Sequence, residues 1–107
     1  MSAPGFRITS GRGFHLSFPN GYTVSVQFGL GNYCANRNLE SMPSDLVAFD
    51  AQLGAQGCPD AEVAVWGPDG DMLHGPDGSW DDCVNGWQSP NEVAALIAWA
   101  VAQPASA

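Results

Sequence analysis

Aspartates on glycine turns are the first residues of this sequence whose types and spacing could do chemistry. The tetrapeptide GPDG occurs at 67–70 and again at 75–78. Carboxylates on such turns could supply the roughly six to eight oxygens that calcium prefers. An EF-hand loop that began at the first aspartate would, however, place Leu73, His74 and Trp80 where ligands and a glycine are required. We therefore interpret both segments as ordinary turns and expect no metal site in them. The aspartates of this stretch are Asp69, Asp71, Asp77, Asp81 and Asp82.

The cysteines and histidines give no recognisable catalytic or metal-binding signature. Cys34, Cys58 and Cys83 are odd in number and too widely spaced for a CxxC zinc motif. Adding His15 or His74 could complete a zinc site or a Cys–His nucleophile, but no family signature surrounds the cysteines. We interpret them as buried or inert thiols and predict a protein that is not an enzyme and needs no cofactor.

Aromatic residues, asparagines and arginines gather in the predicted loops. Aromatic rings stack on nucleobases, amides read base edges, and guanidinium groups bind phosphates in a bidentate fashion. The sequence therefore predicts a recognition surface for a small nucleotide-like ligand. Alternatively, the aromatic residues complete a small core, and Arg37 pairs with a carboxylate. The candidate ligand-binding residues are Arg12, Asn32, Tyr33, Asn36, Arg37, Trp66, Trp80 and Trp87.

Charge is unevenly distributed along the chain. The three cationic side chains are arginines within the first 37 residues, all eleven carboxylates follow from Glu40 onward, and the net charge is −8. Such a surface repels DNA and anionic membranes, so we expect neither as a direct partner. The expected partners are a basic protein surface, a cation or a small ligand held locally near the arginines, and the acids could also serve solubility alone.

A β-hairpin is the strongest structural signal. Apolar and polar residues alternate over 14–18 and again over 22–28, which predicts two strands with one buried face each. A two-residue turn would put these faces on opposite sides of the sheet. A three-residue turn at 19–21 pairs Phe18 with Tyr22 and aligns the faces.

The remaining elements continue this sheet and end in a helix. Ser89, Pro90 and Glu92 form a capping box with proline at the first helical position. The sequence thus predicts a single α+β domain over 1–107, with an antiparallel sheet (hairpin plus meander) and a C-terminal helix packed on one face. We also expect a short strand from residue 6, a short helix capped by Ser44 or Asp45, and strands at 61–66 and 71–74. The sheet should end in a last strand or irregular edge with a turn at Asn85-Gly86.

The C-terminal helix has no charged residue from 93 to 102, which is typical of a helix buried on both sides. Its expected core stripe is Val93, Leu96, Ile97, Ala100 and Val101. Its other side would face a second subunit in a homo-oligomer or be covered within the chain. The residues of that side are Ala95, Trp99 and Ala102.

The segments FHLSFPNGYTVSVQFGLGNYC (14–34), AEVAVWGPDG (61–70) and NEVAALIAWA (91–100) resemble a group of small bacteriophage and prophage proteins without a settled activity. The resemblance implies a phage protein in the cytoplasm of a bacterial host. In agreement with this location, no apolar stretch of the sequence is long enough to cross a membrane. It favours a counter-defence sponge that sequesters a nucleotide-derived immune signal. The alternative is an acidic inhibitor that blocks a host protein, as some phage inhibitors do by imitating DNA. A third interpretation is a calcium-stabilised component of the virion.

Overall fold

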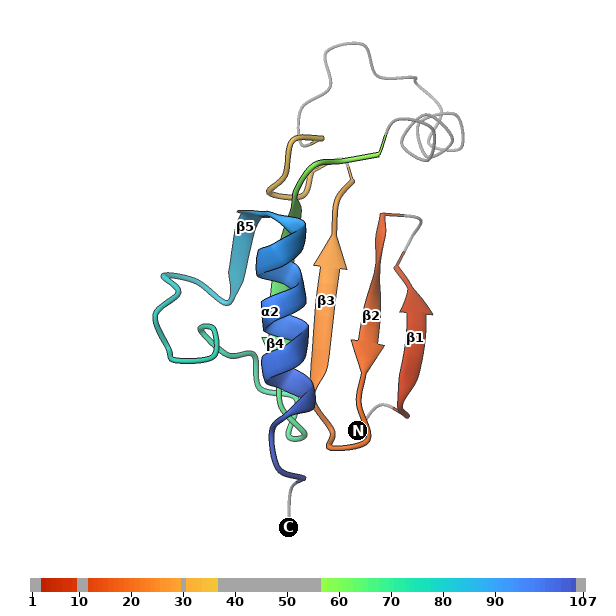
Figure 1. Cartoon of the computed structure of the whole chain (residues 1–107), viewed down its shortest axis with the longest axis vertical. Coiled ribbons are helices and arrows are strands. Elements are labelled where there is room, and N and C mark those ends of the chain that lie inside the picture. Colours follow the sequence, from red (N-terminus) through yellow and green to blue (C-terminus); the bar gives the residue numbers. More distant parts are fainter. Residues whose placement is uncertain (1–2, 10–11, 30, 37–56, 106–107) are drawn as a thin grey trace.

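The computed structural model describes residues 3–9, 12–29, 31–36 and 57–105. In this part of the chain, five antiparallel strands form one sheet in the order β1-β2-β3-β4-β5, and helix α2 packs on one face (Figure 1). The predicted α+β class is therefore confirmed. The elements are β1 Gly5–Ile8, β2 Gly13–Ser17, β3 Thr23–Gln27, β4 Ala61–Trp66, β5 Val84–Gln88 and α2 Pro90–Val101.

The β2–β3 hairpin has the predicted register. Leu16 lies opposite Val24, and the backbone N–H of Phe18 donates to the carbonyl of Tyr22 at 2.9 Å. Gly21 closes the three-residue turn at φ 92°, a conformation that glycine adopts without steric cost. The turn chemistry and the alternation of side chains thus agree on a single pairing.

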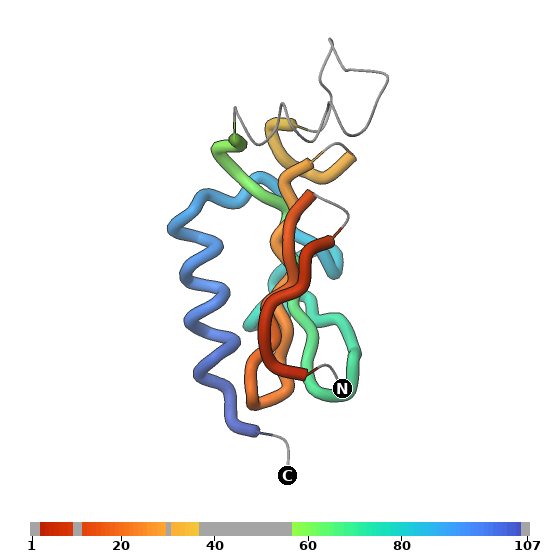
Figure 2. Tube along the Cα trace, turned by 90° about the vertical axis from the view of Figure 1, so that its right-hand side faces the viewer, coloured from red at the N-terminus to blue at the C-terminus, as the bar shows by residue number. Residues whose placement is uncertain are grey.

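The hydrophobic core lies between the sheet and α2, which form two layers (Figure 2). Valines line the inner face because their branched side chains pack well on a pleated surface. Val24 lies opposite Val65, and Val26 lies opposite Val63. The buried core residues are Val24, Val26, Ala61, Val63, Val65, Leu96 and Ala100.

Helix α2 covers β3, β4 and β5 but not the first two strands. Phe6 and Ile8 lie opposite Leu16 and Phe14 on the helix side of the sheet, yet each is about four-fifths exposed (81% and 80%). The core stripe of α2 is also narrower than predicted. Val101 is exposed rather than buried, whereas the preceding Ala100 is fully buried in the core.

Both ends of α2 are capped by side chains. Ser89 Oγ accepts a hydrogen bond from the backbone N–H of Glu92, whose carboxylate accepts one from the N–H of Ser89, so the predicted capping box is confirmed. At the other end, Asn20 Nδ2 donates to the carbonyls of Ala100 and Gln103, both at 2.8 Å. The hairpin turn thereby holds the helix C-terminus, a link that the sequence did not predict.

The β4–β5 connection differs from the predicted meander. Met72 forms only an isolated bridge with Trp66, so residues 71–74 are not a strand. Two consecutive GPDG turns leave too few residues between them for a ladder. Asn85 and Gly86 lie within β5 next to a register shift and do not form a turn. The predicted helix from Ser44 lies outside the described residues.

No helix in the described ranges is long and apolar enough to span a membrane.

Candidate functional site

Two of the predicted ligand-binding residues meet at one end of the sheet. The rings of Tyr33 and Trp87 lie 5.7 Å apart between centroids, with their planes tilted by 34°. Both side chains face solvent, with exposed fractions of 39% and 56%. They form an aromatic pair whose outer surface is open to a flat ligand.

The backbone holds this pair in an unusual geometry. The N–H of Trp87 donates to the carbonyl of Tyr33 at 2.7 Å. Trp87 has φ 51°, the only positive φ among the described residues other than glycine. This region is unfavourable for a bulky side chain, and such strain is concentrated at functional sites. Gly86 permits the close approach, because a Cβ there would lie 2.5 Å from Tyr33 Cβ.

The predicted asparagines shape the loop that carries Tyr33. Asn32 Oδ1 accepts a hydrogen bond from the backbone N–H of Gly29 at 3.0 Å. Asn36 is buried and donates through Nδ2 to the carbonyls of Phe28 and Gly57, at 3.2 and 3.3 Å. These two amide side chains therefore form hydrogen bonds with backbone N–H and carbonyl groups of the loop and its neighbours.

Two carboxylates, which sequence reasoning did not select, fasten the same loop to β4. Glu62 Oε2 accepts from the N–H of Tyr33 at 2.9 Å, and Asp60 Oδ1 accepts from the N–H of Ala35 at 2.7 Å. Hydrogen bonds to ionised acceptors are stronger than neutral ones. In the sequence, the only indication of this role was that the two acids flank Ala61, the first residue of a predicted strand.

The predicted arginines are less informative. The aliphatic stem of Arg12 lies against Gly29, where a Cβ would be 2.6 Å from Arg12 Cγ. Arg12 thus lies at the start of the loop that carries Tyr33. Arg37 lies outside the described residues.

The other tryptophans do not join the aromatic pair. Trp66 makes an edge contact with His15, at 5.0 Å between centroids, on the sheet face opposite α2. Trp80 packs over Gly75 and borders a small pocket beside α2. The expected loop aromatics therefore do not form a single pocket.

The predicted subunit interface includes one residue that packs within the chain. Trp99 is partly buried against the core and makes an edge contact with Tyr22, at 5.8 Å between ring centroids. At Trp99, this side of the helix is therefore covered within the chain, which was the alternative to a subunit interface. Ala95 and Ala102 are exposed, and a homo-oligomer through this side stays a prediction.

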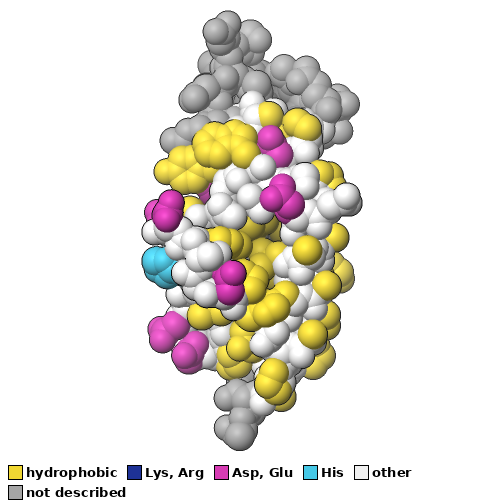
Figure 3. Space-filling view, turned by 60° about the vertical axis from the view of Figure 1, so that its left-hand side comes forward, with side chains coloured by type: hydrophobic (Ala, Val, Ile, Leu, Met, Phe, Trp, Pro, Cys, Tyr) yellow, Lys and Arg dark blue, Asp and Glu magenta, His cyan; other side chains and the backbone are white. Residues whose placement is uncertain are grey.

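The aspartates between β4 and β5 are all exposed, and two of them stabilise turns. Asp69 accepts a hydrogen bond from the N–H of Asp71, and Asp77 accepts one from the N–H of Ser79. The hydrogen bonds from Ser79 lower the pKa of Asp77. Acidic side chains lie to the left of and above an apolar patch on this side of the molecule, and no described lysine or arginine is visible there (Figure 3). Both GPDG segments are thus turns that present carboxylates to solvent.

An apolar groove of about 370 Å³ runs between the first half of α2 and the sheet. Phe14 and Val26 line it from the sheet, and Val93 and Ile97 from the helix. Cys58 and Asp60 border the same groove.

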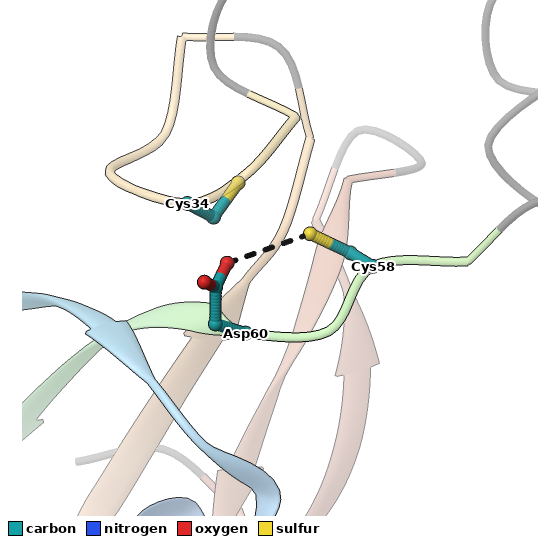
Figure 4. Close-up of side chains that lie close together, drawn as sticks. All are labelled: Cys34, Cys58 and Asp60. Atoms are coloured by element: carbon teal, nitrogen blue, oxygen red, sulfur yellow. Dashed lines mark hydrogen bonds between the residues drawn. The ribbon is translucent and has the colours of Figure 1, made fainter.

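Cys34, Cys58 and Asp60 form a compact cluster (Figure 4). One ligand-type atom from each residue lies within 4.8 Å of the other two, and within the described ranges no other group of this kind occurs. The thiol of Cys34 donates to the carbonyl of Gly29 at 3.6 Å, and that of Cys58 donates to Asp60 Oδ1 at 3.8 Å. Burial is the main cause that raises the pKa of Cys34 from 9.0 to about 11; a backbone hydrogen bond from Asn36 lowers this pKa, and the neighbouring Cys58 and Asp60 raise it.

The third thiol lies beside a histidine. Cys83 Sγ is 3.6 Å from His74 Nε2, and His74 Nδ1 is 3.1 Å from the carbonyl oxygen of Trp80. Because a carbonyl only accepts, Nδ1 carries the proton and Nε2 accepts from the thiol. The Cys–His contact of the described residues therefore joins Cys83 and His74.

No protein-family model matches the chain, and neither a curated protein nor a solved structure does.

Proposed function

We propose that this chain is a non-enzymatic binding protein whose Tyr33–Trp87 pair stacks against the planar ring of a small ligand. The ligand that best suits the sequence is a nucleotide-derived signal, which would make the protein a sponge for bacterial immune messengers. The observation that carries the proposal is the exposed aromatic pair, held by a strained backbone at Trp87.

Stacking supplies affinity without any catalytic group. Each base stacked on an aromatic side chain contributes about 1–3 kcal/mol. Trp87 lies on strand β5, and Tyr33 lies on a loop that Glu62 and Asp60 fasten, so the two neighbouring rings offer a surface that is already ordered. Pre-ordering reduces the entropy cost of binding.

Local charge limits which nucleotides can bind. The net charge of −8 opposes an anionic ligand. Charges farther away than about 8 Å are largely screened at physiological ionic strength. The electrostatic free energy of binding a phosphate therefore depends on the charged groups near the loop. Arg12 attracts phosphate, while Asp60 and Glu62 repel it. Their repulsion is weakened because each carboxylate accepts a backbone hydrogen bond. A ligand with few phosphates is favoured.

Thermal unfolding with a panel of cyclic dinucleotides, cyclic trinucleotides and ADP-ribose derivatives tests the proposal. A ligand at about 100 times its dissociation constant adds roughly 2.7 kcal/mol. That free energy raises the midpoint of a domain this size by about 10 °C. We expect such a shift with one nucleotide, and its loss in Tyr33→Ala and Trp87→Ala.

The control is Trp80→Ala, which removes an indole outside the pair. This variant should unfold at a lower temperature yet keep the ligand-induced shift. A panel without any shift, or equal loss of the shift in all three variants, would contradict the proposal.

An acidic inhibitor of a host protein is the second candidate, favoured by the exposed aspartates of the β4–β5 connection. A basic partner captured on an affinity column would identify the target. Its binding should be lost when Asp77, Asp81 and Asp82 are replaced by lysine and should survive Tyr33→Ala and Trp87→Ala. The two candidates therefore predict opposite outcomes for the same variants.

A further inference from the structure

We infer that Cys34, Cys58 and Asp60 form a binding site for a thiophilic divalent cation, with Zn²⁺ the best match. This site is separate from the aromatic pair and does not depend on the proposed function. Its ligands come from two described segments, the loop that carries Cys34 and the segment that leads into the start of β4 (Figure 4).

The donor set selects the metal. Two sulfurs and one carboxylate oxygen suit zinc, whereas calcium and magnesium prefer oxygen ligands alone. Zinc–ligand bonds of about 2.0–2.3 Å in a tetrahedron place the ligand atoms roughly 3.5–3.8 Å apart. The three atoms now lie within 4.8 Å of one another, so a small adjustment of the side chains brings them to that spacing.

Electrostatics also favour a cation. If both thiols ionised without a metal, three negative charges would gather beside a buried sulfur, which is costly. A divalent cation displaces the two thiol protons to solvent, forms two metal–sulfur bonds and one metal–oxygen bond, and leaves a net charge of −1 at the site. A disulfide would instead need an external oxidant and a thiolate, which the neighbouring carboxylate disfavours.

The surroundings of the cluster resemble those of a metal site. The N–H of Ala35 donates to Asp60 Oδ1 at 2.7 Å, which fixes the orientation of the carboxylate, and the same oxygen faces the thiol of Cys58. Cys58 and Asp60 border the apolar groove, so a fourth coordination position can open toward it. A bound cation would also hold the loop that carries Tyr33 against β4.

Titration of the reduced protein with Co²⁺ alone, followed by Zn²⁺, tests the inference. We expect one equivalent of cobalt to produce thiolate-to-metal absorption and tetrahedral ligand-field bands, which zinc then removes. Cys34→Ser and Cys58→Ser should abolish the thiolate absorption or reduce affinity by more than about 100-fold, since loss of even an outer-shell partner costs about 10–100-fold. Asp60→Asn should weaken binding, and Cys83→Ser is the matched control that should leave it unchanged.

Alkylation of the wild-type protein keeps the test valid if a variant does not fold. Zinc should slow the modification of Cys34 and Cys58 while leaving Cys83 unaffected. Absence of thiolate absorption in the reduced wild type, or equal loss in Cys83→Ser, would overturn the inference. So would a Cys34–Cys58 disulfide that persists in reductant, detected as a mass lower by two hydrogens.

Discussion

The Trp87→Gly variant should have a larger free energy of unfolding than the Trp87→Ala variant. Both variants remove the indole and its contact with Tyr33, so their difference isolates the backbone. The residue has φ 51°, where a Cβ costs roughly 1–2 kcal/mol. Glycine avoids that cost.

Glycine also carries a penalty of about 0.5–1 kcal/mol, because it gives the unfolded chain more freedom. Subtracting this penalty from the strain leaves Trp87→Gly more stable than Trp87→Ala by about 0.5–1 kcal/mol. With a typical urea dependence of about 1–3 kcal/mol per molar, the unfolding midpoint should differ by roughly 0.5 M.

Urea unfolding followed by circular dichroism measures this difference. Asn85 is the control, because it lies in the same strand with an ordinary φ. There glycine should be less stable than alanine by about 0.5–1 kcal/mol, so the sign reverses between the two positions. If Trp87→Gly were the less stable of its pair by a similar amount, the strain assigned to Trp87 would be refuted.

Three further predictions concern stability and are measured by unfolding with urea. Asn20→Ala should destabilise the fold by about 1–3 kcal/mol, because the carbonyls of Ala100 and Gln103 lose their donor; a change below about 0.3 kcal/mol would count against this tie. Ser89→Ala should cost about 1 kcal/mol through loss of the cap, and no loss would contradict the role of the capping box. Because the pKa of Cys34 in the metal-free protein is raised from 9.0 to about 11, the folded state holds its proton more tightly, so metal-free protein should lose about 1–2 kcal/mol of stability as the pH rises from about 9 to 11. Cys34→Ala should lack that loss, and an equal loss in both proteins would exclude Cys34 as its source.

The fold was predictable where local signals agree. The hairpin follows from alternation and from a turn whose length alone aligns both apolar faces, and the start of α2 follows from its capping box. The link from Asn20 to the helix C-terminus was not predictable, because it joins residues 80 positions apart. The predicted strand at 71–74 was wrong. A short segment between two turns has the same sequence pattern whether it forms a strand or only the single bridge between Met72 and Trp66.

The candidate site was predictable only in part. Tyr33 and Trp87 were selected as loop aromatics, but their meeting depends on the close approach at Gly86 and on the positive φ of Trp87, which alternation does not encode.

The cysteine cluster was missed for a related reason. Spacing rules detect ligands that are close in sequence, whereas Cys34 and Cys58 become neighbours only when Asp60 and Glu62 fasten the loop to β4.

The most direct test of the proposed function is an NMR titration that follows the four tryptophan indole N–H signals with the nucleotide that stabilises the protein most. We expect the signal of Trp87 to shift in proportion to binding, while those of Trp66, Trp80 and Trp99 remain in place, because these three rings pack elsewhere in the structure. A saturable shift at another tryptophan with none at Trp87 would contradict the assignment of the aromatic pair as the binding site.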